Sequence, residues 1–163
     1  MDQAVKRRMA VARLVALLAP AILLGGALLS QYVGGLSPCE MCYWQRWPHA
    51  AAIAFALLAV LFRGGLGGRL LLILAALAIA VSGGIGIFHA GVEYGWWEGL
   101  TACSTSAAIG NAQDILNDIM ATPLVRCDVP QWTLLGISLA GYNAILSLGA
   151  AIAIFALMFG RKG

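Results

Sequence analysis

The chain has 163 residues, of which 61% are hydrophobic and only 10% are charged. Soluble domains carry a much larger share of charged residues, so this composition excludes an ordinary soluble globular protein and predicts an integral membrane protein. The net charge of +3 does not indicate nucleic-acid binding, because the basic residues form no single patch and fall in short segments between apolar runs.

Four apolar segments predict four membrane-spanning helices, at about residues 14–33, 43–62, 70–89 and 133–159. The first could be a cleaved signal peptide, but its uncharged run is longer than a signal core, so we expect a retained anchor. The glycine-rich turn at residues 64–68 is short enough to force an antiparallel helix pair. The predicted fold is therefore an all-α integral membrane protein, an antiparallel four-helix transmembrane bundle in a single domain covering residues 1–163.

The distribution of basic residues predicts the orientation of this bundle. With four spans, all but two of the ten lysines and arginines lie on one side, which the positive-inside rule makes cytoplasmic. Both termini are then cytoplasmic, and the loops at about residues 34–42 and 90–132, with all four cysteines, face outward. The basic residues on the cytoplasmic side are Lys6, Arg7, Arg8, Arg13, Arg63, Arg69, Arg161 and Lys162.

The long second outer loop contains a pattern typical of a surface helix. Ile109, Ala112, Ile115 and Ile119 recur at spacings of three and four, with polar residues on the other faces. We therefore predict a short amphipathic helix over residues 106–120 that lies on the membrane surface.

A CxxC motif, Cys39 and Cys42, stands where the first apolar run gives way to the second. If a helix begins near Pro38, both thiols lie in its first turns, where the helix dipole favours a thiolate. Arg46 follows Cys42 by four residues and is expected on the same face, one turn deeper. The motif indicates a redox-active pair at the membrane edge.

Four interpretations of the cysteines remain open. The simplest pairing joins Cys39 to Cys42 and Cys103 to Cys127, although the sequence does not exclude the other two connectivities. Both pairs could be structural disulfides, or all four thiols could bind zinc, although the second pair lacks a tight spacing. Haem attachment would need a histidine where Tyr43 stands. The fourth interpretation, an electron relay from the loop pair to the membrane-edge pair, is our working hypothesis.

A relay needs a two-electron acceptor, and the sequence contains no nucleotide-binding or haem motif. A lipid-soluble quinone fits the position of Cys42 and Arg46, and the arginine would hold a quinone oxygen. The alternative role for Arg46 is an interfacial side chain that reaches the headgroups. Gln45 is a neutral donor and acceptor at the same level, and His89 is either a polar cap or a hydrogen-bond donor to a carbonyl oxygen. No metal ligand is assigned under this hypothesis.

Several stretches carry a resemblance to a known family. The run Pro38-Cys39 through Gln45-Arg46, the residues at 91–98 before Cys103, and those at 127–132 resemble the bacterial disulfide bond formation protein B (DsbB) family. The resemblance covers nearly the whole chain. The vitamin K epoxide reductase-like group is also a membrane thiol relay, but its loop cysteines precede the tight pair, whereas here the tight pair comes first.

The resemblance implies a quinone-dependent thiol oxidase in the bacterial inner membrane. It implies a DsbA-like periplasmic dithiol oxidase as partner and the membrane quinone pool as acceptor, with ubiquinone favoured over menaquinone. By the same resemblance, the partner's thiolate attacks Cys103, which is paired with Cys127. Cys39 then receives electrons from the loop pair, and Cys42 faces the quinone near Arg46, with His89 as a further contact.

Overall fold

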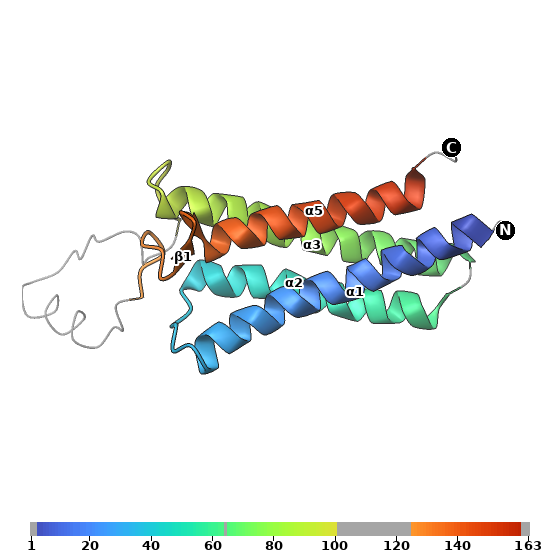
Figure 1. The fold of residues 1–163 in the computed structure, drawn as a ribbon, viewed down its shortest axis with the longest axis horizontal. Coiled ribbons are helices and arrows are strands. Elements are labelled where there is room, and N and C mark those ends of the chain that lie inside the picture. Colours follow the sequence, from blue (N-terminus) through green and yellow to red (C-terminus); the bar gives the residue numbers. More distant parts are fainter. Residues whose placement is uncertain (1–2, 64, 101–124, 161–163) are drawn as a thin grey trace, which may run out of the picture.

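The computed structural model describes residues 3–63, 65–100 and 125–160. Within these residues four helices lie side by side: α1 (Gln3–Tyr32), α2 (Glu40–Leu61), α3 (Gly65–Glu93) and α5 (Leu139–Phe159) (Figure 1). The start of α1 and the end of α5 lie at one end of the molecule, and the start of α2 lies at the other (Figure 1). The predicted surface helix at 106–120 falls outside the described residues.

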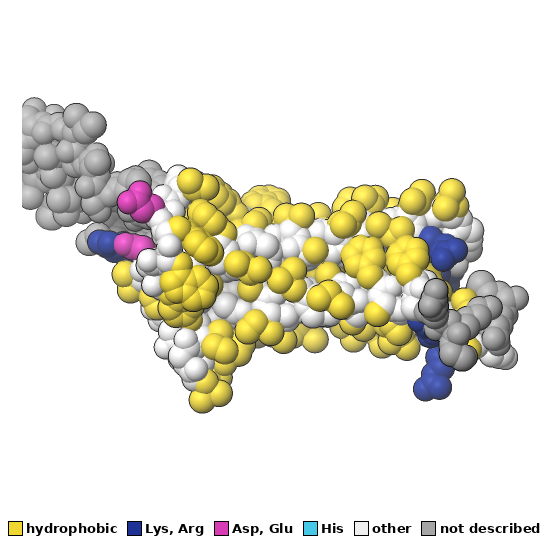
Figure 2. Space-filling view, turned by 90° about the horizontal axis from the view of Figure 1, so that it is seen from above, with side chains coloured by type: hydrophobic (Ala, Val, Ile, Leu, Met, Phe, Trp, Pro, Cys, Tyr) yellow, Lys and Arg dark blue, Asp and Glu magenta, His cyan; other side chains and the backbone are white. Residues whose placement is uncertain are grey.

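Three of the described helices, α1, α3 and α5, are long and apolar enough to cross a membrane. Helix α2 has 22 residues, and polar side chains occupy its first turns. Large apolar side chains point outward along the whole length of the molecule, and Ile22 and Ile152 are each 68% exposed (Figure 2). Such a surface is unstable in water and suits lipid, so the prediction of a helical, multi-pass membrane protein is confirmed.

The starts of two helices are determined by side-chain caps. Cys39 precedes α2 in an extended conformation, and its Sγ accepts a hydrogen bond from the backbone N–H of Cys42 at 3.3 Å. Ser138 caps α5 in the same way, and its Oγ accepts from the N–H of Gly141 at 3.1 Å. Each cap satisfies a backbone donor that the helix itself leaves unpaired.

A short hairpin precedes α5 and was not predicted. Strand β1 (Thr133–Leu134) pairs antiparallel with β2 (Ile137–Ser138), and the two residues between them, Leu135 and Gly136, both have positive φ. Such a turn matches the twist of the paired strands. The last helix therefore begins at Leu139 rather than at residue 133, because an apolar composition alone does not mark where the chain turns.

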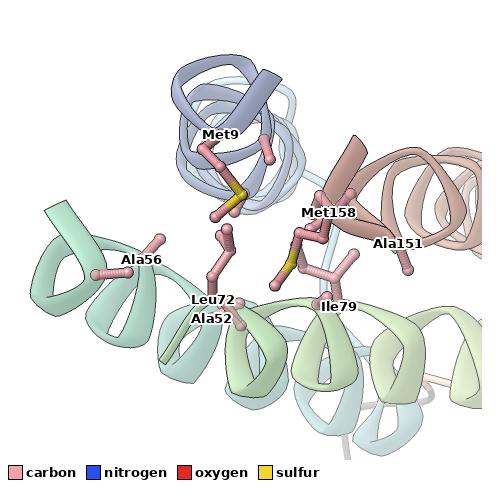
Figure 3. Close-up of a cluster of buried hydrophobic side chains, with 13 residues drawn as sticks. Met9, Ala52, Ala56, Leu72, Ile79, Ala151 and Met158 are labelled. Atoms are coloured by element: carbon pink, nitrogen blue, oxygen red, sulfur yellow. The ribbon is translucent and has the colours of Figure 1, made fainter. Parts of the chain in front are cut away.

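The interior of the bundle is built from small side chains. Figure 3 shows Met9 of α1, Ala52 and Ala56 of α2, and Leu72 of α3 converging with side chains of α5. Alanines are abundant there because small residues allow helix backbones to approach closely where lipid offers no hydrophobic driving force.

Gly86 of α3 lets the backbones of α3 and α5 approach closely. A Cβ added at Gly86 would lie 3.0 Å from the carbonyl oxygen of Ala140 and 3.0 Å from the backbone nitrogen of Ala144, both in α5. A Cβ added at Gly84 would meet no atom within 4 Å. Two glycines that are close in sequence therefore differ in what they contact.

This contrast yields a stability prediction. Gly86→Leu should lower the free energy of unfolding by about 1–3 kcal/mol, because the new side chain must push α5 away from α3. Gly84→Leu is the matched control and should be no less stable than the parent. Unfolding in detergent, followed by circular dichroism, measures both variants. Equal stability of the two would contradict the contact between α3 and α5.

Candidate functional site

The two cysteines of the CxxC motif lie together at the start of α2. Their Sγ atoms are 2.8 Å apart, and Cys39 is only 4% exposed. The hydrogen bond with Cys42 and burial raise the pKa of the Cys39 thiol above its ordinary value, so Cys39 holds its proton tightly in the reduced pair. The first thiolate of the pair is therefore expected on Cys42, within the first turn of the helix.

Arg46 lies one turn deeper in α2 and is directed toward α1. Its Nη1 donates to Gln31 Oε1 at 2.5 Å, its Nη2 donates to the carbonyl oxygen of Ala27 at 3.2 Å, and its guanidinium carbon lies 5.2 Å from the centre of the Tyr43 ring. Its buried Nε has no hydrogen-bond partner among the described residues. Arg46 is thus held by protein groups and keeps one donor available.

His89 and Gln45 are brought to the cysteines by the packing of α3 against α2. The Nε2 atom of His89 lies 3.5 Å from Cys39 Sγ, and its Nδ1 lies 2.8 Å from Gln45 Nε2. Both side chains are almost fully buried. Glu93, one turn further along α3, places a carboxylate oxygen 3.7 Å from His89 Nε2. The predicted site residues Cys39, Gln45 and His89 therefore meet directly.

In the described part of the second loop, Cys127 packs next to the CxxC motif. Cys127 is completely buried in one apolar cluster with Cys39, Met41 and Val92, and it also makes a backbone hydrogen bond with His89. Cys103 lies outside the described residues. One cysteine of the predicted loop pair is thus packed with the residue that was predicted to receive its electrons.

Two polar contacts accompany this loop. Gln131 Nε2 donates to the carbonyl oxygen of Ser37, which ties the loop to the segment just before Cys39. Arg126 and Asp128 form an ion pair through two hydrogen bonds, and the guanidinium holds the pKa of the Asp128 carboxyl below its usual range. Arg126 is exposed, so this pair stabilises the loop little.

A cavity of about 260 Å³ opens beside the cysteines. Apolar side chains of α1 form much of its wall, and polar groups converge from α2, α3 and α5. Cys42 and Arg46 lie on the same wall, four residues apart on α2. Its other polar lining residues include Gln31, Gln45, His49, His89, Glu93 and Asn143.

The sulfur and imidazole atoms could also hold a metal ion. The Sγ atoms of Cys39 and Cys42 and a ring nitrogen of His89 all lie within 4.8 Å of one another. Sulfur and nitrogen donors suit zinc, which takes four ligands in a structural site. This group differs from the set of four cysteines weighed from the sequence, because a histidine is included.

The sequence could not supply the partners of a second group of polar residues, which includes the ambiguous His49 of α2. His49 Nε2 lies 2.8 Å from Asn143 Oδ1 and 3.0 Å from Ser82 Oγ, and Ser147 Oγ donates to Asn143 Oδ1 at 2.9 Å. The available signal was the presence of hydrogen-bonding side chains in otherwise apolar segments, with Asn143 and Ser147 one turn apart. Their partners depend on how the helices pack, which the sequence pattern does not specify.

Comparison with known proteins now decides the family. The family model described as "Disulfide bond formation protein DsbB" matches residues 7–157. The chain belongs to the DsbB family. It is therefore a membrane protein of disulfide-bond formation, and the oxidoreductase class predicted from the cysteines is confirmed.

Individual DsbB relatives support this assignment. A protein named "Disulfide bond formation protein B" from Xanthomonas campestris is 30% identical over 160 residues, covering 91% of this chain and 88% of the relative. A protein of the same name from Chromohalobacter salexigens is 31% identical over 144 residues, covering 76% and 80%. An uncharacterised protein from Rickettsia prowazekii is 28% identical over 160 residues, covering 96% and 92%. No solved structure matches the chain.

The proximity of the two sulfurs yields a second prediction. In a Cys103→Ser, Cys127→Ser double variant, mild oxidation should join Cys39 to Cys42 within one molecule, because their Sγ atoms already lie 2.8 Å apart. Alkylation followed by peptide mass spectrometry should then find both thiols protected together. Adding Cys42→Ser to the same background is the control and should leave Cys39 open to alkylation after reduction of any intermolecular bond. Disulfide-linked dimers in place of the internal bond would contradict the prediction.

Proposed function

We propose that this protein is a thiol:quinone oxidoreductase that reoxidises a DsbA-like periplasmic dithiol oxidase. The observation that carries the proposal is the packing of Cys127 with Cys39, next to a cavity on whose wall Cys42 and Arg46 lie together. A sulfur from the loop, a sulfur pair at a helix start and a cation beside a lipid-facing cavity form a continuous path for electrons.

The proposed topology has four helices crossing the bacterial inner membrane in alternating directions. Arg8 donates to the carbonyl oxygens of Ala156 and Gly160, and Arg13 donates to that of Arg63, so the described arginines near the start of α1 lie at the end opposite the cysteines. Figure 2 shows basic side chains at this end, and acidic side chains with a basic one beside them at the other. By the positive-inside rule both termini are cytoplasmic and all cysteines are periplasmic. The surface helix at 106–120 stays a prediction.

The proposed thiol exchange has two stages. The partner's thiolate attacks Cys103, the Cys103–Cys127 bond breaks, and Cys127 leaves as a thiolate. That thiolate attacks Cys39, breaks the Cys39–Cys42 bond and releases Cys42 as a thiolate. The partner's second thiol displaces Cys103, which in turn displaces Cys39 from Cys127 and restores the loop disulfide. The net result moves two electrons and two protons from the partner to the Cys39–Cys42 pair.

The cavity residues fit a quinone. Apolar side chains of α1 suit a ring and a lipid tail, and the buried Arg46 Nε is a donor without a protein partner among the described residues. Arg46 would hold a ring oxygen, and Gln45 and His89 border the same space. A bound quinone would supply an acceptor for the two electrons and two protons that the dithiol releases. Ubiquinone is the expected species, and menaquinone is the alternative.

Two other functions are distinguished by simple observations. A vitamin K epoxide reductase-like relay has its loop cysteines before the tight pair, which is the reverse of the order found here. A non-catalytic membrane protein, with structural disulfides or thiolate-bound zinc, would show no turnover and, in the zinc case, stoichiometric metal. The non-catalytic alternative gives Arg46 and its available donor no role.

Anaerobic mixing of oxidised protein, quinone and a reduced thioredoxin-fold dithiol tests the proposal. The wild type should convert about one quinone to quinol per dithiol oxidised, seen as loss of quinone absorbance. Cys103→Ser should reduce this conversion to background, because the partner's thiolate has no sulfur to attack. Cys39→Ser keeps the loop disulfide, so it should still capture a single-cysteine partner covalently without forming quinol. Undiminished quinol formation by Cys103→Ser would refute its assigned role.

The role of Arg46 leads to a separate prediction. Arg46→Met should raise the KM for quinone about tenfold or more, since a hydrogen bond from a charged donor contributes about 1.5–3 kcal/mol. Arg69→Met, at the opposite end of the bundle, is the matched control and should leave the KM unchanged. Steady-state kinetics with quinone varied at fixed dithiol measure both. A normal KM in a folded Arg46→Met variant would contradict quinone binding by Arg46 and favour an interfacial role for this side chain.

A further inference from the structure

The amide of Asn143 has only one orientation that satisfies its neighbours. Its Nδ2 lies 3.1 Å from the carbonyl oxygen of Ser82, and its Oδ1 lies 2.9 Å from Ser147 Oγ. A carbonyl oxygen can only accept, so the atom facing Ser82 must be the nitrogen. The same nitrogen donates to Gln45 Oε1 at 2.8 Å.

The amide orientation of Gln45 in turn determines which ring nitrogen of His89 carries the proton. Its Oε1 accepts from Asn143, and its Nε2 donates to the carbonyl oxygen of Met41 at 3.2 Å, so its amide is also fixed. The Nε2 donor of Gln45 lies 2.8 Å from His89 Nδ1. That ring nitrogen must therefore accept, and in the neutral imidazole the proton resides on Nε2.

The protonated nitrogen faces sulfur. His89 Nε2 lies 3.5 Å from Cys39 Sγ and 3.7 Å from a carboxylate oxygen of Glu93, and the imidazole also makes a backbone hydrogen bond with Cys127. We propose that Asn143 and Gln45 are positioning residues that hold His89 in the Nε2–H tautomer, so that the imidazole donates a hydrogen bond to the Cys39 sulfur during thiol exchange. The catalytic consequence of this inference rests on the proposed function, whereas the tautomer of His89 does not depend on it.

The donated hydrogen bond acts where negative charge forms on Cys39. When Cys103 displaces Cys39 from the Cys39–Cys127 bond, the electron pair of that bond goes to Cys39, which leaves as a thiolate. Cys39 is buried, and a thiolate there loses most of its solvation. The N–H of a neutral imidazole stabilises this charge without adding a second buried charge. His89 thus acts on the reacting sulfur, and Asn143 and Gln45 act through His89.

Nitrogen NMR of the ring-labelled histidines tests the tautomer directly. The protein has two histidines, and a His49→Gln variant assigns the His89 signals. In the wild type at neutral pH, His89 should show a protonated Nε2 and an unprotonated Nδ1. Asn143→Ala should shift the signals toward a mixture of tautomers, because the Gln45 amide loses the donor to its Oε1 and is then held only by its 3.2 Å contact with the Met41 carbonyl oxygen. Ser147→Ala is the matched control, since it leaves both Asn143 Nδ2 contacts intact and should keep the wild-type tautomer.

The kinetic arm measures exchange at Cys39 separately from quinone turnover. A small thiol that attacks Cys42 of the Cys39–Cys42 bond should release Cys39 as a thiolate about tenfold more slowly in Asn143→Ala than in Ser147→Ala. A protonated Nδ1 in wild-type His89 would overturn the inference even if the variant fails to fold. Equal exchange rates despite a changed tautomer would overturn its catalytic part. Failure of the proposed function would instead abolish quinol formation and leave the NMR result unaffected.

Discussion

Polar side chains inside a membrane-embedded helical bundle must find their partners within the protein, because lipid offers no hydrogen bonds. Five polar side chains find such partners in one another, although the buried Nδ1 of His49 has none among the described residues: Gln45, His49, Ser82, Asn143 and Ser147. They come from α2, α3 and α5, so the network joins the three helices at a defined register. In a uniformly apolar bundle, hydrophobic burial alone does not fix how far one helix slides along its neighbour. Polar contacts between helices supply that register.

The chemistry proposed at the cysteine end of the bundle depends on this register. The hydrogen bond between Gln45 and His89 links the network to the cysteine pair, and the glycine at 86 lets α5 come close enough for Asn143 to reach α2 and α3. Because the medium has a low dielectric constant, every charge near the sulfurs is costly unless it is paired. Arg46 meets that cost through contacts with α1, whereas His89 contributes a neutral donor.

The sequence supported the local parts of this arrangement better than the long-range parts. The CxxC pair and Arg46 could be placed from helical periodicity alone, because they belong to one helix. The neighbours of His89 and Asn143 could not, since they depend on how far one helix slides along another, and an apolar pattern is nearly the same at every register. The hairpin at residues 133–138 was missed for a related reason: its residues are as apolar as the helix that follows.

The same network bears on whether the sulfur and imidazole group serves redox chemistry or metal binding. Coordination of a metal by His89 Nε2 requires its proton to move to Nδ1, and Gln45 would then have to turn its oxygen toward the ring. That rotation gives up the hydrogen bonds of Gln45 with Met41 and Asn143, and leaving such buried groups unpaired is costly. Forming the Cys39–Cys42 disulfide joins two sulfurs that already lie 2.8 Å apart, with two electrons and two protons passing to the acceptor, and it leaves His89 where it is. The hydrogen-bond pattern therefore favours a thiol relay over a metal site at this position.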